Sequence, residues 1–196
     1  MNLILASTSE IRRRLLAKAG IPVDVVAPIL DEAHARQGLA ADLPAAGVAE
    51  FLAAAKARTV SATHPDHHVI GADQILILDN AIFAKPGDLA EARRHLASLR
   101  GRTHMLITTA VVLRGDRVLA TITDSASLTM RHFSDAFLDR YLAAAGPDVT
   151  RSVGAYRLEE LGAQLFERIE GDYFTILGLP LLPLLSFLRA ERLIPS

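Results

Sequence analysis

Apolar runs alternate along the chain with helical patterns and turn residues, which predicts short strands and helices in mixed order. Runs of buried-type apolar residues between turn residues predict the strands. Two long β-type segments meet at Gly115-Asp116, a pair that favours a hairpin. The expected strands cover residues 2–6, 23–27, 69–78, 103–113, 117–129, 164–169 and 173–177.

Start and stop signals place helices between these strands. Ser9 is the expected N-cap of one helix, which Gly20 ends, and Asp88 with Glu91 forms a capping-box pattern for another. The stretch 31–42 is polar and is expected to be a loop. The expected helices cover residues 10–19, 44–62, 89–100, 135–145 and 180–193.

Hairpins interspersed with helices predict an α/β protein with a mixed, twisted sheet rather than a strictly parallel one. A chain of 196 residues could form one large domain or two small lobes, and we expect a single domain over residues 1–196. Hydrophobic residues make up 51% of the chain and aromatic residues only 5%, so the core is expected to consist mainly of Leu, Ala, Val and Ile.

Charge and composition exclude several classes of protein. The 21 basic and 22 acidic residues give a net charge of −1, which argues against stable binding to nucleic acid. The absence of cysteine excludes disulfides and thiolate chemistry. The start has no basic segment typical of a signal peptide, and the apolar run 177–188 is shorter than the roughly 20 residues that span a bilayer. We therefore expect a cytoplasmic protein without membrane association.

Asp73 follows the apolar run from Val69 and is itself followed by Gln74 and further apolar residues. An unpaired charge is costly to bury, so a carboxylate in such a strand suggests a metal ligand or a general base. The alternative is an aspartate that turns the chain or caps a neighbouring element.

The turn Ser7-Thr8-Ser9 lies between an expected strand and a helix that carries the cluster Arg12-Arg13-Arg14. Backbone N–H groups at a helix start, hydroxyls and arginines together favour a bound phosphate. An ordinary turn beside a solvated basic face is the alternative.

Lys56 and Lys85 are candidate phosphate ligands, although each alone is typical of a surface lysine. Asp31-Glu32 would gain a function by meeting Asp73 in space, since paired carboxylates can hold a magnesium-type ion. The histidines of 64–68 need no metal to explain them, because no second ligand set has supporting spacing. The chain lacks the P-loop, G-x-G-x-x-G, G-x-S-x-G and H-E-x-x-H signatures.

The order of these motifs resembles the Maf family of nucleoside triphosphate pyrophosphatases over nearly the whole chain. The matching segments are Leu5-Ala6-Ser7-Thr8-Ser9 with Arg12-Arg13, Asp31-Glu32, Lys56-Ala57, Gly71-Ala72-Asp73, Lys85-Pro86, the stretch from Gly101 to His104, Gly154-Ala155-Tyr156, Ile169-Glu170-Gly171-Asp172-Tyr173 and Gly178-Leu179-Pro180-Leu181. The resemblance implies an inosine-triphosphatase-like fold with a cleft between two lobes. The implied reaction converts a nucleoside triphosphate and water to the monophosphate and pyrophosphate with a divalent cation, Mg²⁺ or Mn²⁺.

Within the family the chain looks most similar to the branch acting on 7-methyl-GTP, on the basis of Gln74, Glu159 and the segment 165–168. Two departures bear on substrate. Glu10 stands where the family has proline, and Ile11 replaces an aromatic residue that would stack on a cationic base. Glu159 is expected to accept hydrogen bonds from the N–H groups of guanine.

The resemblance also implies roles for the site residues. Asp73 is expected to be the proton acceptor, and Glu32, alone or with Asp73, is expected to hold the metal. The expected catalytic lysines and triphosphate-binding residues are Lys56, Lys85, Ser7, Ser9, Arg12 and Arg13, and those expected to select the base are Ile11, Gln74 and Glu159.

Two alternatives stay open at the level of sequence. One is a dTTP/UTP pyrophosphatase of the same family rather than an enzyme that removes modified nucleotides such as 7-methyl-GTP. The other is a nucleotide-binding regulator without turnover, which the Glu10 and Ile11 departures suggest, and the resemblance to the family adds a link to cell division. The oligomeric state is also open, with a homodimer among the alternatives.

Overall fold

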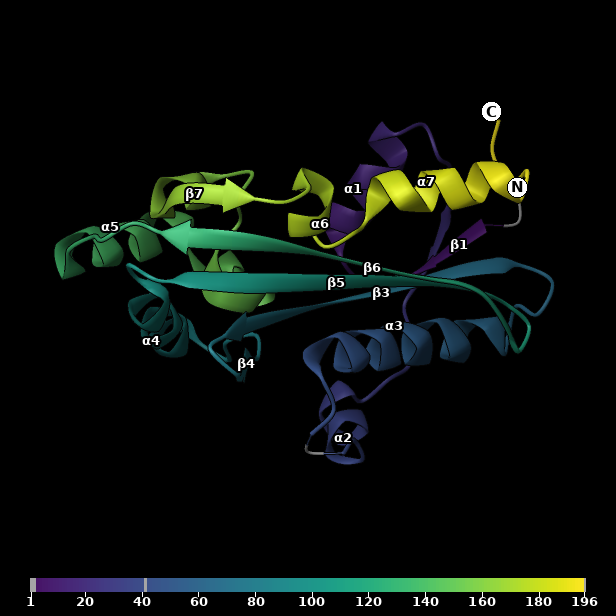
Figure 1. Ribbon diagram of the computed structural model, residues 1–196, viewed down its shortest axis with the longest axis horizontal. Helices are drawn as coiled ribbons and strands as arrows, with labels where there is room; N and C mark the ends of the chain where they lie inside the picture. The colour runs from purple at the N-terminus through teal and green to yellow at the C-terminus, as the bar shows by residue number, and fades with distance from the viewer. Residues whose placement is uncertain (1–2, 41, 196) are drawn as a thin grey trace. The chain divides into compact units, whose positions relative to one another are not determined.

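The computed structural model describes residues 3–40 and 42–195, and Figure 1 shows its helices and strands. The expected strand at 2–6 is observed from residue 3, since residue 2 lies outside the described part. No helix within the described residues is long and apolar enough to cross a membrane. The elements in chain order are β1 (Leu3–Ala6), α1 (Glu10–Lys18), β2 (Asp24–Val26), α2 (Glu32–Gln37), α3 (Ala45–Ser61), β3 (His68–Leu78), β4 (Ala81–Phe83), α4 (Leu89–Leu99), β5 (Thr103–Arg114), β6 (Arg117–Met130), α5 (Asp135–Ala145), the short 3₁₀ helices η1 (Pro147–Arg151), η2 (Val153–Ala155) and η3 (Leu161–Leu165), β7 (Phe166–Glu170), α6 (Tyr173–Ile176) and α7 (Leu181–Ala190).

The strands form one seven-stranded sheet in the order β2-β1-β3-β5-β6-β7, with β4 paired to β3. β1 runs parallel to both β2 and β3, whereas β4 is antiparallel to β3 and β7 is antiparallel to β6. The expectation of a mixed α/β sheet flanked by helices is therefore confirmed.

The chain divides into two compact units. The first contains Met1–Gln74, Thr108–Asp124 and Tyr173–Ser196, and the second contains Ile75–Ile107 and Ser125–Asp172. β3, β5 and β6 each contribute residues to both units. The expectation of a single domain over the whole chain stays a prediction.

In the first unit α3 packs closely on β3 because small residues face each other. Ala53 and Ala57 of α3 belong to one buried cluster with Val69 of β3. A Cβ atom on Gly71 would lie only 2.2 Å from the carbonyl oxygen of Ala53, so any larger residue at Gly71 would push the helix away. Figure 1 shows α3 along one face of the sheet near β3 and α7 along the other face. The close contact fixes the distance from β3 to every side chain of α3 that faces it.

In the second unit the capping box that the sequence predicts closes around the start of α4. The Asp88 carboxylate accepts the Glu91 N–H at 2.7 Å, and the Glu91 carboxylate accepts the Gly87 N–H at 2.7 Å. A buried cluster of aromatic rings lies elsewhere in this unit, where His104 Nε2 is 2.7 Å from the Tyr156 hydroxyl and Phe166 packs on both rings. Burial lowers the pKa of His104 to about 4, so the imidazole is neutral at pH 7.

Two expectations about secondary structure were wrong. Residues 31–42 contain helix α2, which has no buried residue and therefore shows no apolar periodicity. The segment 173–177, expected to be a strand, instead begins with helix α6 (Tyr173–Ile176), although aromatic and β-branched residues dominate it. Gly178, at φ +96°, is the second residue after this helical turn, and the Gly178 N–H donates to the Thr175 carbonyl at 3.0 Å. The sequence also placed the strand at 164–169 slightly early, because β7 is preceded by η3.

Candidate active site

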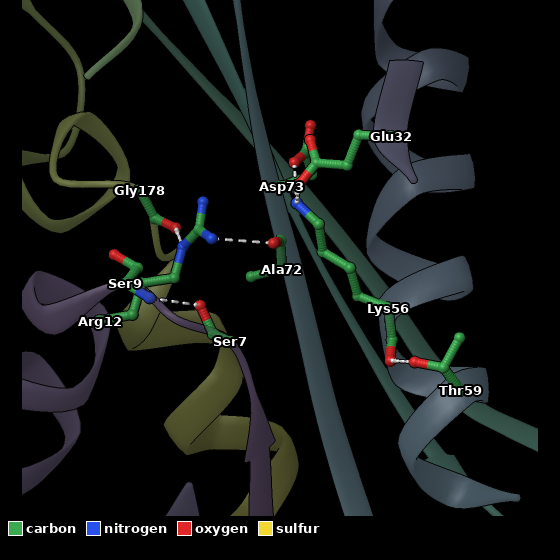
Figure 2. A network of polar contacts seen from close by, with 9 residues as sticks. All are labelled: Ser7, Ser9, Arg12, Glu32, Lys56, Thr59, Ala72, Asp73 and Gly178. Carbon is green, nitrogen blue, oxygen red and sulfur yellow. Dashed lines mark hydrogen bonds and ion pairs between the residues drawn. The ribbon is translucent and has the colours of Figure 1, made fainter. Parts of the chain in front are cut away.

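The centre of the candidate site is a buried ion pair between α3 and β3. Lys56 is 6% exposed and Asp73 is 5% exposed, and Lys56 Nζ lies 2.6 Å from Asp73 Oδ1. The same ammonium group lies 2.9 Å from Glu32 Oε1 of α2 (Figure 2). Three residues that the sequence marked separately are therefore brought together within one unit.

The local fold explains why this lysine is buried. Lys56 lies in α3 about one turn from Leu52, Ala53 and Val60, and all three of these residues are buried. On β3, Gly71 and Asp73 point to the same face because side chains alternate along a strand. The close approach of α3 at Gly71 thus also brings the lysine to the carboxylate of Asp73.

Two carboxylates, Asp73 and Glu32, share the one ammonium group of Lys56, and the guanidinium group of Arg12 also interacts electrostatically with both carboxylates. Asp73 Oδ2 is also buried and has no hydrogen-bond partner among residues 3–40 and 42–195. A buried carboxylate oxygen without a partner is costly, and a bound cation or a water molecule would compensate for it.

The donor set fits a magnesium-type ion. Such ions bind oxygen atoms, often use only one or two protein carboxylates, and keep water or phosphate oxygens as their other ligands. Within the described part of the chain, no group of three or more His, Cys, Asp or Glu side chains could hold a metal without such outside ligands. Asp73 and Glu32 are therefore the candidate protein ligands.

Arg12 lies on the other side of β3 and binds backbone carbonyl groups. Its Nε donates to the Gly178 carbonyl at 2.6 Å and its Nη1 donates to the Ala72 carbonyl at 2.9 Å (Figure 2). Desolvation lowers the pKa of Arg12, while the carboxylates of Asp73 and Glu32 oppose that shift. Because an arginine titrates so far above neutrality, the guanidinium group stays charged at pH 7.

The hydroxyl group of Ser7 orders the turn before α1. Ser7 is 4% exposed, and its Oγ accepts the Ser9 N–H at 3.1 Å. Ser9 is the N-cap residue of α1 as expected, but its side chain makes no capping hydrogen bond. The hydroxyl of Ser9 therefore accepts no hydrogen bond from the backbone N–H groups of the first turn of α1.

Arg13 is exposed and pairs with Glu10 on the same helix. Arg13 Nε donates to Glu10 Oε2 at 2.9 Å, and Arg13 Nη2 donates to Glu10 Oε1 at 2.5 Å. This pairing lowers the pKa of Glu10 and raises that of Arg13. The departure from the family pattern at Glu10 therefore places a carboxylate on one of the two arginines expected to bind phosphate. Ile11, between the two, is half-buried.

Gln74 is surrounded by groups of its own unit. Its Nε2 lies 2.9 Å from Thr108 Oγ1, 3.0 Å from the Thr175 carbonyl oxygen and 3.0 Å from the Ile176 carbonyl oxygen. Thr108 and Thr175 are fully buried, and Thr175 Oγ1 donates to Asp124 Oδ2 at 2.7 Å. The polar pair Thr108-Thr109 inside the apolar segment 103–113 was a signal for Thr108 in the sequence, and Thr175 had no such signal.

Lys85 and Glu159 belong to the second unit and are both exposed. Lys85 follows β4 and precedes buried Pro86, and the next residue, Gly87, is held by Glu91 of α4 at 2.7 Å. Glu159 lies between η2 and η3. Their expected contacts with phosphate and base stay predictions.

Comparisons with known proteins agree with the resemblance seen in the sequence. A family model described as Maf-like protein matches residues 2–191. The chain is 50% identical to a protein of Rhodospirillum rubrum named nucleoside triphosphate pyrophosphatase, over 98% of this chain and 96% of that protein. It is 48% identical to a protein of the same name from Granulibacter bethesdensis, over 98% of each chain. It is also 50% identical to a protein of Rhizobium meliloti named 7-methyl-GTP pyrophosphatase, over 95% of this chain and 94% of that protein.

Proposed function

We propose, because the chain belongs to the Maf family, that it hydrolyses a nucleoside triphosphate to the monophosphate and pyrophosphate, with 7-methyl-GTP as the favoured substrate. The match to the family model and the names of the relatives place the chain in the enzyme class of nucleoside triphosphate pyrophosphatases. What we propose beyond this class is the role of each residue, the use of a divalent metal ion and the choice of base.

The observation that carries the proposal is the buried group of Asp73, Lys56 and Glu32. A structural ion pair would satisfy both oxygens of a buried carboxylate, whereas Asp73 keeps Oδ2 without a partner among the described residues. Such an oxygen can accept a proton from a water molecule. The Asp73–Lys56 contact keeps Oδ1 engaged and so leaves Oδ2 for this role.

In the proposed reaction, water attacks the α–β phosphoanhydride, the anhydride P–O bond breaks and pyrophosphate leaves. Asp73 Oδ2 accepts the proton of the attacking water. A divalent cation held by Glu32 would supply positive charge to the phosphate oxygens, which leaves Asp73 Oδ2 to accept the proton. Lys56 holds the carboxylate of Asp73 in place and offsets part of its charge.

Ser7, Ser9, Arg12, Arg13 and Lys85 are proposed to bind the triphosphate. The hydroxyl of Ser9, which makes no capping hydrogen bond at the start of α1, supports this role, as does the charged guanidinium of Arg12 beside β3. Arg13 can bind the triphosphate only when its guanidinium group leaves the Glu10 carboxylate and binds a phosphate oxygen instead. Lys85 would bind as a point charge on a short segment fixed by Pro86.

The choice of base is the finer part of the proposal. One relative is named for 7-methyl-GTP, and Glu159 offers a carboxylate to the N–H donors of a guanine edge. Ile11 cannot stack on a cationic base, an interaction worth about 0.5–2 kcal/mol. A preference for dTTP or UTP is the second candidate, favoured by the isoleucine at this position.

The test is pyrophosphate release from GTP, 7-methyl-GTP, UTP and dTTP with Mg²⁺ or Mn²⁺. We expect the highest kcat/KM for 7-methyl-GTP. Glu159→Gln should reduce the preference for guanine over pyrimidine substrates, and Ile11→Trp should increase the preference for 7-methyl-GTP over GTP. Binding of nucleotides without release of pyrophosphate would instead identify a regulator. A wild-type preference for UTP or dTTP that Glu159→Gln leaves unchanged would exclude the 7-methyl-GTP assignment.

A further inference from the structure

The carboxylate of Glu159 is carried by a loop of the second unit that closes tightly on itself. The Glu160 N–H donates to the Arg157 carbonyl at 3.2 Å, which forms a turn around Glu159. Gly162 is buried, and a Cβ atom on it would lie only 2.3 Å from the Arg157 carbonyl oxygen. Because this contact is with backbone atoms, the loop can be so narrow only with glycine at position 162. We call residues 157–162 the Glu159 loop.

The segment that leads into the Glu159 loop is fixed by two buried tyrosines. The Tyr156 hydroxyl lies 2.7 Å from His104 Nε2, and the Tyr141 hydroxyl of α5 donates to the Ala155 carbonyl at 3.4 Å. Ala155 has a φ of +60°, a left-handed conformation that a residue with a Cβ atom keeps only where its surroundings hold it there. The start of the loop therefore has a fixed position within its unit.

Arg157 links the Glu159 loop to the 3₁₀ helix η1. Its Nη1 donates to Glu160 Oε1 at 3.2 Å, within the loop, and its Nη2 lies 3.6 Å from Asp148 Oδ2 of η1. The Arg157 side chain is only 26% exposed, so salt screens these ion pairs less than it screens pairs in open water. One guanidinium group thus joins the loop to η1 through two carboxylates.

Only one of the two adjacent glutamates is engaged by this arginine. Glu160 accepts from Arg157, whereas Glu159 makes no hydrogen bond or ion pair with the residues in the ranges 3–40 and 42–195. Burial raises the pKa of Tyr141, and the negative charges of Glu160 and Glu159 raise it further, so both carboxylates lie near the hydroxyl of α5. The pairing of Glu160 with Arg157 leaves the Glu159 carboxylate as an acceptor for a ligand.

We infer that Arg157 is a positioning residue for the choice of base. It holds the Glu159 loop closed through Glu160 and Asp148, and so fixes the point at which the Glu159 carboxylate accepts hydrogen bonds from a guanine edge. This role rests on the proposed function, because it requires Glu159 to read the base. A carboxylate discriminates between bases only while it is held where the N–H donors of the correct base arrive. The planar fork of an arginine suits this task, because it can hold two carboxylates in one geometry.

The experiment compares Arg157→Met with the matched control Arg151→Met. Methionine keeps an unbranched apolar stem and removes the charge. Arg151 also pairs with Asp148, at 3.5 Å, but its side chain is 77% exposed and lies outside the Glu159 loop. The measured quantity is the ratio of kcat/KM for GTP to kcat/KM for UTP, with Mg²⁺, at a temperature where circular dichroism shows each variant folded.

We expect Arg157→Met to reduce this ratio about three- to tenfold, because a misplaced acceptor weakens the hydrogen bonds that guanine makes and uracil does not. The reduction should come from a loss with GTP rather than from a gain with UTP. Glu160→Gln, which removes the charge that Arg157 holds within the loop, should reduce the ratio by a smaller factor. Arg151→Met should keep the wild-type ratio.

A double variant separates the positioning of Glu159 from a general effect on the structure. If Arg157 acts through Glu159, Arg157→Met should change the ratio little once Glu159→Gln is present, because the residue that it positions is already altered. A full further reduction in the double variant would show that Arg157 acts independently of Glu159, and would overturn the positioning role.

Other results separate this role from the proposed function. A wild-type ratio in folded Arg157→Met, together with a reduced ratio in Glu159→Gln, would overturn the positioning role and leave the proposed reading of the base intact. A wild-type ratio in Glu159→Gln, or a wild-type protein that releases no pyrophosphate, would overturn the proposed function and the positioning role with it. If Arg157→Met does not fold, Glu160→Gln against Arg151→Met decides the question, and equal ratios in these two variants overturn the positioning role.

Discussion

Asp73→Asn should abolish most turnover while the protein stays folded. The change keeps the volume of the side chain and an oxygen that can accept from Lys56, but it removes the negative charge. Lys56 would still have Glu32 at 2.9 Å as a charged partner, so the variant does not leave a buried ammonium group alone. The loss in the free energy of unfolding is therefore about 1–3 kcal/mol, the usual cost of weakening one charged hydrogen bond.

That loss is small compared with the expected loss of activity. For a chain of this size, 1 kcal/mol corresponds to about 2–4 °C in Tm, so Asp73→Asn should melt roughly 2–12 °C below the wild type and remain folded at 25 °C. Removal of a general base costs about 10²–10⁴ in rate. A decrease in kcat of that size cannot come from a change in the folded fraction.

The assay is steady-state release of pyrophosphate with Mg²⁺, together with thermal unfolding followed by circular dichroism. Asp79→Asn is the matched control, since Asp79 directly follows β3, is exposed and pairs with Arg102. Asparagine tolerates the positive φ of residue 79 as well as aspartate does. The control should keep the wild-type kcat. If Asp73→Asn retained kcat within about threefold of the wild type, Asp73 would not be the proton acceptor.

Three further predictions test other contacts. Glu10→Gln should lower KM about two- to fivefold at low ionic strength, because it releases Arg13 for phosphate; an unchanged KM would show that Arg13 does not bind substrate. Gly71→Ala should cost about 1–3 kcal/mol in unfolding free energy and reduce kcat, since its Cβ would lie 2.2 Å from a carbonyl oxygen of α3, while Gly38→Ala, with nothing closer than 3.9 Å, is the neutral control. The pKa of His104 falls to about 4 in the folded protein against about 6.5 when unfolded, so its contribution to stability is present above pH 6.5 and declines as the pH falls toward 4. The free energy of unfolding, measured with urea, should fall between pH 7 and pH 4.5 by about 2 kcal/mol less in His104→Gln than in the wild type. Equal decreases would contradict the lowered pKa of His104.

The elements that the sequence predicted correctly have a clear apolar pattern. Helix α3 and strand β3 are buried along much of their length, and the hairpin of β5 and β6 has Gly115 at φ +57°, as a tight turn requires. Helix α2 has no buried residue, so nothing in its pattern could distinguish it from a loop. In α6, hydrogen bonds from Gln74 and Thr108 to Thr175 override a local preference for strand, and such contacts come from residues far away in the sequence.

The burial of Lys56 was predictable from the sequence, although an isolated lysine is usually exposed. Lys56 is four residues from Leu52 and four from Val60, which places it within the apolar stripe of an alanine-rich helix. A lysine in such a stripe needs a charged partner, because burial without one is costly. The sequence could not name the partner, since Asp73 lies on a different element and Glu32 lies in a segment that was expected to be a loop.

Gln74 illustrates a different limit, since its type and its place beside Asp73 suggested contact with substrate. Alternation along β3 was enough to put Asp73 and Gln74 on opposite faces once the strand was recognised. What the alternation could not give was the occupant of the second face, because the expected strand at 173–177 would have used its carbonyl groups in the sheet. As a helical turn, that segment instead directs the carbonyls of Thr175 and Ile176 at the amide of Gln74. The contacts of Gln74 therefore depend on the secondary structure of a segment about 100 residues away, which the sequence predicted wrongly, while the expected role of Gln74 in selecting the base stays a prediction.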